Sequence, residues 1–519
     1  MKNKIFPIIC ASLLLFVVSC KNDFLQYTQS GAASTDNFWK TESDAKLAAN
    51  GLYSFLTNDD IVGRGFMWYI DACDDMVVGR DKAQAVNMKN FVDAGSNSYT
   101  SLNWPTMYQI IKRANDIIIH VPQMDISQDV KNSVLGQAYF FRAWAYMWLA
   151  SRYGDQRAGL PIVEPTLSVN IDSLDIPRAK NVSVNYLYCI NDWKKAASLL
   201  PYFDELGTAD YGRPHKTACW AYIAKAYLYN AEWDASSYAH VVDYADSVIE
   251  SGKHALLANY GDVFKIANNW SKEYIWSFVS NNIAGSITPS VFLENKGWGK
   301  YNGWGYWHAT LELYNEFEAN DPRREVTILK YGDKFVYFGD TMRYWSTNNR
   351  TGFQFNKFMD PFRDSDPVGH NIINPNGDEP TTTLNVPLIR YAEVLLFKAE
   401  GLIMQGKNGD EPLNEVRARV GLPPKTNATM DDLKHERRVE LAGEWADRHY
   451  DLVRWHDAEK VYAQPLHGQI HTDLTNPDSP YTIQEVWPVR KFDPVINHVW
   501  PIPPAEIQAS KVLKQNEGY

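Results

Sequence analysis

A glycine-rich segment at 297–308 carries the residues whose types and spacing are best suited to binding chemistry. It reads Gly-Trp-Gly-Lys-Tyr-Asn-Gly-Trp-Gly-Tyr-Trp-His, so most positions are glycine or aromatic. This spacing fits neither an amphipathic helix nor a regular strand, because interior glycines weaken both. We therefore predict a loop that carries the rings of Trp298, Tyr301, Trp304, Tyr306 and Trp307.

Flat amphipathic rings on a loop have two roles open to them. They can stack on the apolar faces of sugar rings. They can also fold down and cap the hydrophobic core, since most large aromatic side chains are substantially buried. Composition alone favours capping, and both interpretations stay open at this point. Trp68 and Tyr69, in a stretch flanked by Gly63, Gly65 and Gly79, form a second candidate for a ligand surface.

The patterns of catalytic and metal-binding residues are incomplete. His435-Glu436 begins like the motif His-Glu-x-x-His of metalloproteases, but Val439 occupies the position of the second histidine. We expect Glu436 and the charged residues after it to form ion pairs or to cap neighbouring helical hairpins. The segment 374–378 lacks the acidic twelfth ligand of a calcium loop and is interpreted as a turn.

Other signatures of enzymes are missing from the sequence. It contains no nucleophile elbow and no phosphate-binding loop, and no particular pair stands out among the 62 acidic residues. We expect a protein without catalytic residues, cofactors or a metal ion.

The beginning of the chain indicates export. An apolar run over 5–18 follows two lysines and is shorter than the roughly 20 residues that cross a bilayer. A signal peptide is therefore predicted over 1–19. The tetrapeptide Val-Val-Ser-Cys that ends it resembles a bacterial lipobox, so Cys20 is the predicted lipidated residue. The alternative is cleavage elsewhere, with Cys20 as a bystander.

Composition limits the classes of function. A net charge of -11 and the absence of a basic run argue against nucleic acid, and 45% hydrophobic residues are ample for a large core. Five cysteines show neither a disulfide framework nor a zinc spacing. We expect Cys73, Cys189 and Cys219 to be buried apolar residues.

The elements that must position the candidate residues are mostly helical. Helical periodicity predicts helices over 41–53, 107–121, 134–150, 186–200, 216–230, 238–250, 388–396, 413–420 and 435–444. Thr41, with Asp44 three residues on, predicts a capping box at the start of the first helix. The pair 216–230 and 238–250 alternates small and large residues as tetratricopeptide hairpins do. Between the two helical parts, 268–383 is rich in Gly, Asn, Pro and aromatic residues, with strand candidates at 274–279 and 334–339. A segment that long without regular structure is usually functional, so we expect the ligand face there.

Ordered motifs occur along nearly the whole chain: Asn-Phe-Trp-Lys-Thr-Glu at 37–42, Gly-Leu-Tyr at 51–53, Leu-Ile-Arg-Tyr-Ala-Glu-Val-Leu-Leu at 388–396, Leu-Asn-Glu-Val-Arg-Ala-Arg-Val-Gly-Leu-Pro at 413–423, Arg-Val-Glu-Leu-Ala-Gly-Glu at 438–444, Arg-His-Tyr-Asp-Leu-Val-Arg-Trp at 448–455, Trp-Pro-Ile-Pro-Pro-Ala-Glu-Ile at 500–507 and Gln-Asn-Glu-Gly-Tyr at 515–519. Together with the lipobox they resemble the SusD/RagB family of outer-membrane lipoproteins of Bacteroidetes, over 20–519.

The resemblance implies a mostly α SusD-like fold, in which tetratricopeptide-like helical hairpins support an irregular, loop-rich region with a few short strands. The chain would then divide into a helical part at 21–267, a binding region at 268–383 and a helical signature part at 384–519. The resemblance also implies that the charged residues at 436–444 are structural.

The implied function is a non-catalytic, glycan-binding lipoprotein of the outer membrane that passes oligosaccharides to a SusC-like TonB-dependent transporter. With the resemblance added, we expect ligand contacts first from Trp298, Tyr301, Trp304 and Trp307, and also from Tyr306, Trp68 and Tyr69. These rings are chosen by local composition, because ligand residues of the family vary with substrate. The alternatives are a surface glycoside hydrolase that uses the rings as subsites, and a peptide-binding relative.

Overall fold

The structure is a computed structural model that describes residues 38–57, 73–80, 82–97, 101–166, 175–280, 293, 303–363, 382–444 and 448–519. Several predictions concern residues outside these ranges. They are the signal peptide, the lipidation of Cys20, the turn at 374–378, and the ligand contacts of Trp68, Tyr69, Trp298 and Tyr301.

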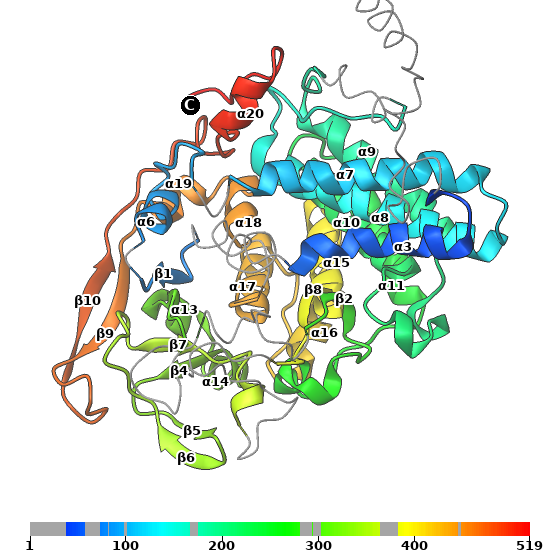
Figure 1. Cartoon of the computed structure of the whole chain (residues 1–519). Helices are drawn as coiled ribbons and strands as arrows, with labels where there is room; N and C mark the ends of the chain where they lie inside the picture. Colours follow the sequence, from blue (N-terminus) through cyan, green and yellow to red (C-terminus); the bar gives the residue numbers. More distant parts are fainter. Residues whose placement is uncertain are drawn as a thin grey trace, which may run out of the picture.

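The first half of the chain forms a layer of packed helices, which Figure 1 shows with α3, α7 and α8 side by side. The helices of the layer are α3 (Glu42–Tyr53), α7 (Asn103–His120), α8 (Gln128–Tyr153), α9 (Val182–Leu199), α10 (Lys216–Asn230) and α11 (Ser237–Glu250), whereas α6 (Ala83–Lys89) lies apart from them and contacts β1 (Met76–Val78). From α7 to α11 each helix packs against the next one along the chain. This succession of neighbouring helices is the arrangement expected of helical hairpins.

A buried ion pair and close packing at a glycine both hold this layer together. The Arg142 guanidinium on α8 pairs with Asp192 on α9 at 2.7 Å and donates to Asn115 Oδ1 on α7 at 2.7 Å. Gly136 lets α9 approach, because a Cβ at this position would lie 2.6 Å from the Leu200 side chain. At the start of the layer, Thr41 caps α3, as the sequence predicts.

The second half mixes short strands with further helices. The helices are α13 (Leu311–Glu316), α14 (Arg323–Thr327), α15 (Tyr391–Met404), α16 (Asp410–Arg419), α17 (Met430–Leu441), α18 (Arg448–Arg454), α19 (Ala458–Tyr462) and α20 (Pro504–Ala509). Helix α15 packs against α11, and α16 and α17 pack against α15, so the helical layer continues.

The strands form antiparallel two-stranded sheets. They pair β1 (Met76–Val78) with β3 (Trp307–Ala309), β2 (Tyr274–Phe278) with β8 (Val386–Arg390), β4 (Ile328–Lys330) with β7 (Phe353–Phe355), β5 (Lys334–Tyr337) with β6 (Asp340–Arg343), and β9 (Leu466–His471) with β10 (Tyr481–Trp487). Short segments of 3-10 helix include η7 (Tyr260–Phe264), which precedes β2, and η9 (Asp360–Phe362), which follows β7.

The mostly α class and most predicted helices are confirmed, but several boundaries differ from the prediction. Helices α8, α9 and α17 begin at Gln128, Val182 and Met430, before the predicted starts at 134, 186 and 435, and α15 extends to Met404, beyond 396. Helix α7 begins four residues before the predicted start at 107, because Pro105 in its first turn gives up no helical hydrogen bond. The segment 388–390, predicted as helix, is strand: Ile389 pairs with Trp276, and α15 begins at Tyr391. The segment 268–383 holds more regular structure than predicted, in elements of three to six residues that are too short to show a period.

The core contains the three cysteines as expected. Cys73, Cys189 and Cys219 are free and buried. Burial raises the pKa of the Cys73 thiol to about 12, so this group is protonated at neutral pH. None of the helices in the described part of the chain combines the length and the apolar character that a bilayer crossing requires.

Candidate ligand-binding site

A three-residue ladder joins the ends of the two aromatic segments singled out from the sequence. Met76 pairs with Ala309, Val77 with His308 and Val78 with Trp307. The chain that leads into β1 contains Trp68 and Tyr69, and the chain that leads into β3 contains Trp298 and Tyr301. A ladder of this length spans only about 10 Å. Two segments more than 200 residues apart in sequence therefore join one small sheet.

Glycine makes the close approach of these two segments feasible. The Gly79 amide donates a hydrogen bond to the Tyr306 carbonyl at 2.7 Å and so extends the ladder. A Cβ on Gly79 would lie 2.2 Å from the Gly305 carbonyl oxygen and 2.5 Å from His308 Nε2. Gly305 has φ +57°, in the left-handed region that favours glycine. Gly305, in the predicted loop, thus gives the backbone before β3 the left-handed conformation that it needs.

The three described rings of this segment differ in burial. Tyr306 and Trp307 are only 3% and 1% exposed, whereas Trp304 is partly buried. The rings form a row: Trp304 meets Tyr306 edge-on at 5.9 Å, and Tyr306 lies 5.4 Å from Trp307. Tyr306 and Trp307 belong to the core in this structure, as the capping interpretation describes, and they support the partly exposed Trp304 from beneath.

Arg80 is a candidate that the sequence does not reveal. Its guanidinium carbon lies 5.0 Å from the centre of the Tyr306 ring, on the chain that leaves β1. Arg80 is partly exposed, forms no ion pair within the described residues and carries five N–H donors. No spacing in the sequence connects positions 80 and 306, because only the β1–β3 pairing brings them together.

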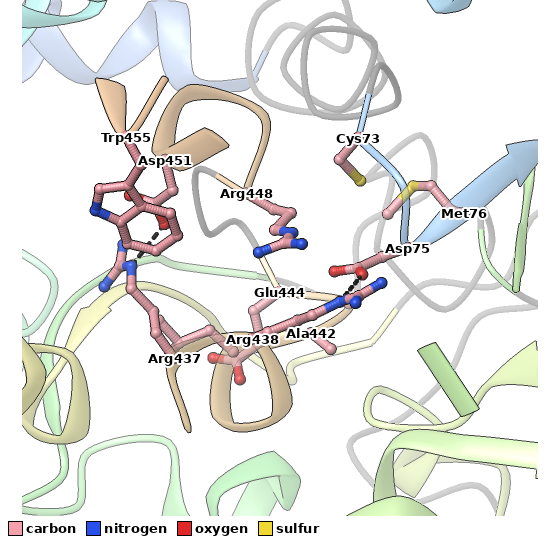
Figure 2. Close-up of a pocket in the computed structure, with 12 residues that line it drawn as sticks. Cys73, Asp75, Met76, Arg437, Arg438, Ala442, Glu444, Arg448, Asp451 and Trp455 are labelled. Atoms are coloured by element: carbon pink, nitrogen blue, oxygen red, sulfur yellow. Dashed lines mark hydrogen bonds and ion pairs between the residues drawn. The ribbon is translucent and has the colours of Figure 1, made fainter. Parts of the chain in front are cut away.

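The residues that precede β1 are fixed to α17 and α18 by ion pairs. Arg438 contacts Asp75 at 2.7 Å and Asp74 at 2.9 Å, and Arg448 contacts Asp74 at 3.0 Å. Burial by itself raises the pKa of Asp74, but the two arginines outweigh burial, and the pKa is lowered. Figure 2 shows the ion pair of Asp75 and Arg438 at the edge of a cavity that Cys73 and Met76 also line.

This cavity is too small to bind a sugar. Its volume is about 20 Å³, which is room for a single water molecule. Its lining includes Arg437, which pairs with Asp451 at 2.6 Å, and Arg438, which pairs with Asp75 at 2.7 Å, and Figure 2 marks both contacts. We interpret the cavity as a junction that positions the chain entering β1.

The sequence predicts that Glu436 and the charged residues after it form ion pairs. The structure confirms this prediction, and the partners lie on other elements. Glu436 binds Arg323 and Arg417, Glu440 binds Arg323, Arg390 and Arg419, and Glu444 binds Arg390 and Lys357. Although burial by itself raises it, the pKa of Glu440 is held well below its usual value by the three arginines.

The donor atoms of Glu318, His435 and Glu436 lie within 4.8 Å of one another, a spacing that a metal ion could use. Arg417 Nη1 already lies 2.7 Å from Glu318 and 2.8 Å from Glu436. Because this cation neutralises both carboxylates, we assign no metal to the cluster.

Comparison with known proteins adds independent information. The family model described as SusD family matches residues 272–519, and the model described as starch-binding, associating with outer membrane, matches residues 24–228. A SusD-like protein of Formosa agariphila is 24% identical, with 98% of each chain covered. The starch-binding protein SusD of Bacteroides thetaiotaomicron is 24% identical over 67% of each chain.

A solved structure supports the same fold. The SusD-like protein from Bacteroides fragilis superposes with a TM-score of 0.78 at 23% identity, covering 96% of this chain and 100% of the other. At this level of identity the similarity establishes the fold, which agrees with the mostly α architecture described above.

Proposed function

This chain belongs to the SusD/RagB family, and from that premise we propose that it is a non-catalytic, glycan-binding lipoprotein of the cell surface. The single observation that carries the proposal is the pairing of β1 with β3, which joins both aromatic segments to one small sheet. The starch-binding relative supports a saccharide as the class of ligand.

In the proposed mechanism, rings stack on the apolar faces of sugars and polar side chains read the hydroxyl groups. Trp304 offers a partly exposed ring, and Arg80 offers planar donors over the neighbouring ring of Tyr306. Trp298, Tyr301, Trp68 and Tyr69 complete the proposed set of stacking rings. Tyr306 and Trp307 act as support for these contacts rather than as ligand contacts.

The proposal also covers the cellular location of the protein and the transporter with which it works. Lipidation of Cys20 would anchor the protein stably, because a lipidated residue with several acyl chains holds a protein at a membrane where one chain does not. The family description of association with the outer membrane supports this location. We propose that the bound oligosaccharide is passed to a SusC-like TonB-dependent transporter, against which the lipoprotein closes.

Calorimetric titration of a soluble protein that begins at Lys21 tests the proposal, with a panel of oligosaccharides and peptides as ligands. We expect one intact glycan to bind and Trp304→Ala to weaken it. Trp220→Ala, which removes another partly buried indole from α10, is the matched control and should bind normally.

Three results would change the conclusion. Cleavage of the glycan would establish the hydrolase alternative, and binding of peptides alone would establish the peptide-binding alternative. Normal glycan affinity in Trp304→Ala would remove Trp304 from the site while leaving glycan binding in place.

A further inference from the structure

A groove of about 930 Å³ opens between η7, α14, β4, β5 and the residues around η9. Figure 1 shows α14, β4 and β5 grouped together, and none of the groove's lining residues belongs to β1 or β3. Its volume lies at the upper end of the range for ligand pockets, which is about 300 to 1,000 Å³. It is therefore separate from the site proposed above and large enough for an oligosaccharide.

Apolar and aromatic side chains form part of its lining. Phe264, Phe335, Ile328 and Leu329 are buried against the groove, and the partly buried ring of Tyr314 joins them. Tyr314 is held in place by stacking on Phe353, with ring centres 4.9 Å apart. These residues supply surface that suits the CH faces of sugar rings.

Helix α14 sends two neighbouring arginines to different environments. Arg323 is fully buried and binds Asp321, Glu436 and Glu440. Arg324 lines the groove instead, with its guanidinium carbon 5.2 Å from the centre of the Tyr314 ring. Across the described residues Arg324 forms no ion pair, so its donors remain available to an occupant of the groove.

Three more charged side chains in the lining behave in the same way. Lys334, Glu325 and Asp333 form no ion pairs with described residues, although both signs of charge share one groove. Asp333 accepts a hydrogen bond from the Lys330 amide at 2.8 Å, which orients its carboxylate. By contrast, the lining residues Lys265 and Lys357 are paired, with Asp262 at 2.7 Å and Glu444 at 2.8 Å.

Two further charged residues of the lining are held within the fold: Arg363 donates to Asn356 Oδ1, and Asp360 accepts from the Ile266 amide at 3.0 Å. This leaves two cations, Arg324 and Lys334, and two carboxylates, Glu325 and Asp333, to select among ligand classes. A simple anion would approach Arg324 and Lys334 but would be repelled by Glu325 and Asp333, and a cation would meet the opposite problem. A sugar hydroxyl both donates and accepts hydrogen bonds, so a neutral polyhydroxylated molecule satisfies all four groups. We propose that this groove is a second saccharide site, which binds a neutral oligosaccharide.

Labelling of carboxylates by carbodiimide and glycine ethyl ester, read by mass spectrometry, tests this proposal on the soluble protein that begins at Lys21. The probes are maltohexaose, cellohexaose and laminarihexaose at saturating concentration. We expect at least one of them to slow the labelling of Glu325 threefold or more. The exposed Glu411, which lies on α16 outside the groove, should label at an unchanged rate.

Variants show whether the protection of Glu325 comes from an oligosaccharide bound in the groove or from an effect elsewhere in the protein. Arg324→Ala with Lys334→Ala should lower the affinity for the protecting oligosaccharide at the groove tenfold or more. Lys407→Ala with Lys491→Ala removes two exposed lysines elsewhere and should leave protection of Glu325 unchanged. An unchanged thermal unfolding midpoint for both double variants shows that the fold is intact.

Two outcomes overturn the proposal: no protection of Glu325 by any of the three hexasaccharides, or protection that survives the change of Arg324 and Lys334. The outcome also distinguishes this site from the function proposed above. If Trp304→Ala weakens glycan binding in the titration and Glu325 is not shielded, the groove is no saccharide site while glycan binding near β3 stands. If Glu325 is shielded and Trp304→Ala binds normally, the groove stands and the site near β3 falls.

Discussion

The Nε atom of Arg438 on α17 lies 2.7 Å from Oδ1 of Asp75, directly before β1. Asp75 is 2% exposed, so this ion pair ties the helix to the strand from inside the protein. Helix α17 therefore helps to set the position of β1, and through the β1–β3 ladder the position of Trp304 and Arg80. Charged residues of the C-terminal part therefore help to position the proposed ligand site.

Removal of the arginine should cost stability. Arg438→Met leaves Asp75 buried without the cation it pairs with, while Asp74 keeps Arg448, and breaking a buried pair typically destabilises a protein by about 3 to 5 kcal/mol. Urea unfolding followed by tryptophan fluorescence measures the change. Lys112→Met breaks the exposed pair with Asp116 and should cost less than about 1 kcal/mol. Equal effects of the two substitutions would contradict a buried role for Arg438.

The ladder itself depends on Gly79. Gly79→Ala places a Cβ 2.2 Å from a backbone oxygen, so β1 and β3 must separate, and both stability and glycan affinity should fall. Gly207→Ala is the matched control, because a Cβ at Gly207 meets nothing within 4 Å. Its φ of -70° is accessible to alanine, and the control should be neutral or stabilising by up to about 1 kcal/mol. Calorimetric unfolding and titration compare the two variants.

Arg80 should matter for binding and little for folding. Arg80→Met removes the donors beside Tyr306 while it keeps an unbranched side chain of similar reach. We expect glycan affinity to fall about tenfold, equivalent to about 1.4 kcal/mol. The thermal midpoint should change by only a few degrees, since a cation over a ring contributes about 0.5 to 1 kcal/mol at exposed sites. Full affinity in this variant would place the ligand away from Arg80.

Four buried histidines make stability sensitive to mild acid. Burial lowers the pKa of His215, His308 and His449 to about 3 and of His254 to about 4, below the ordinary value of 6.5. The unfolded chain then binds more protons than the folded one, so the stabilisation is complete above pH 6.5 and is lost as the pH falls toward 4. For His254 the loss should approach roughly 3 kcal/mol.

Urea unfolding at several values between pH 4 and pH 7 checks this dependence. His254 accepts from the Thr217 hydroxyl at 2.8 Å and donates to the Lys272 carbonyl at 3.0 Å when it is neutral with the proton on Nδ1. His254→Gln removes the titrating ring, so the slope of stability against pH should become shallower by up to about one proton. An unchanged slope would show that His254 does not contribute to the acid sensitivity.

Local signals in the sequence predicted much of the helical framework. The side chains of Thr41 and Asp44 form the predicted cap, and α10 spans the predicted 216–230 because its small and apolar residues repeat at helical spacing. The strand at 386–390 was missed in part, because Leu388 and Ile389 are as apolar as the helix that follows. Only pairing with β2 makes them a strand.

The sequence by itself determined the class of the fold, the family motifs and the concentration of rings at 297–308, because these are properties of composition and of short-range spacing. The tertiary structure decided which rings are buried, since β3 is buried along its whole length where it pairs with β1, and this places Trp307 in the core. It also decided the roles of Arg80 and Arg324, which depend on Tyr306 and Tyr314. Contacts between residues so far apart in the chain leave no periodic trace, and they exist only once the chain has folded.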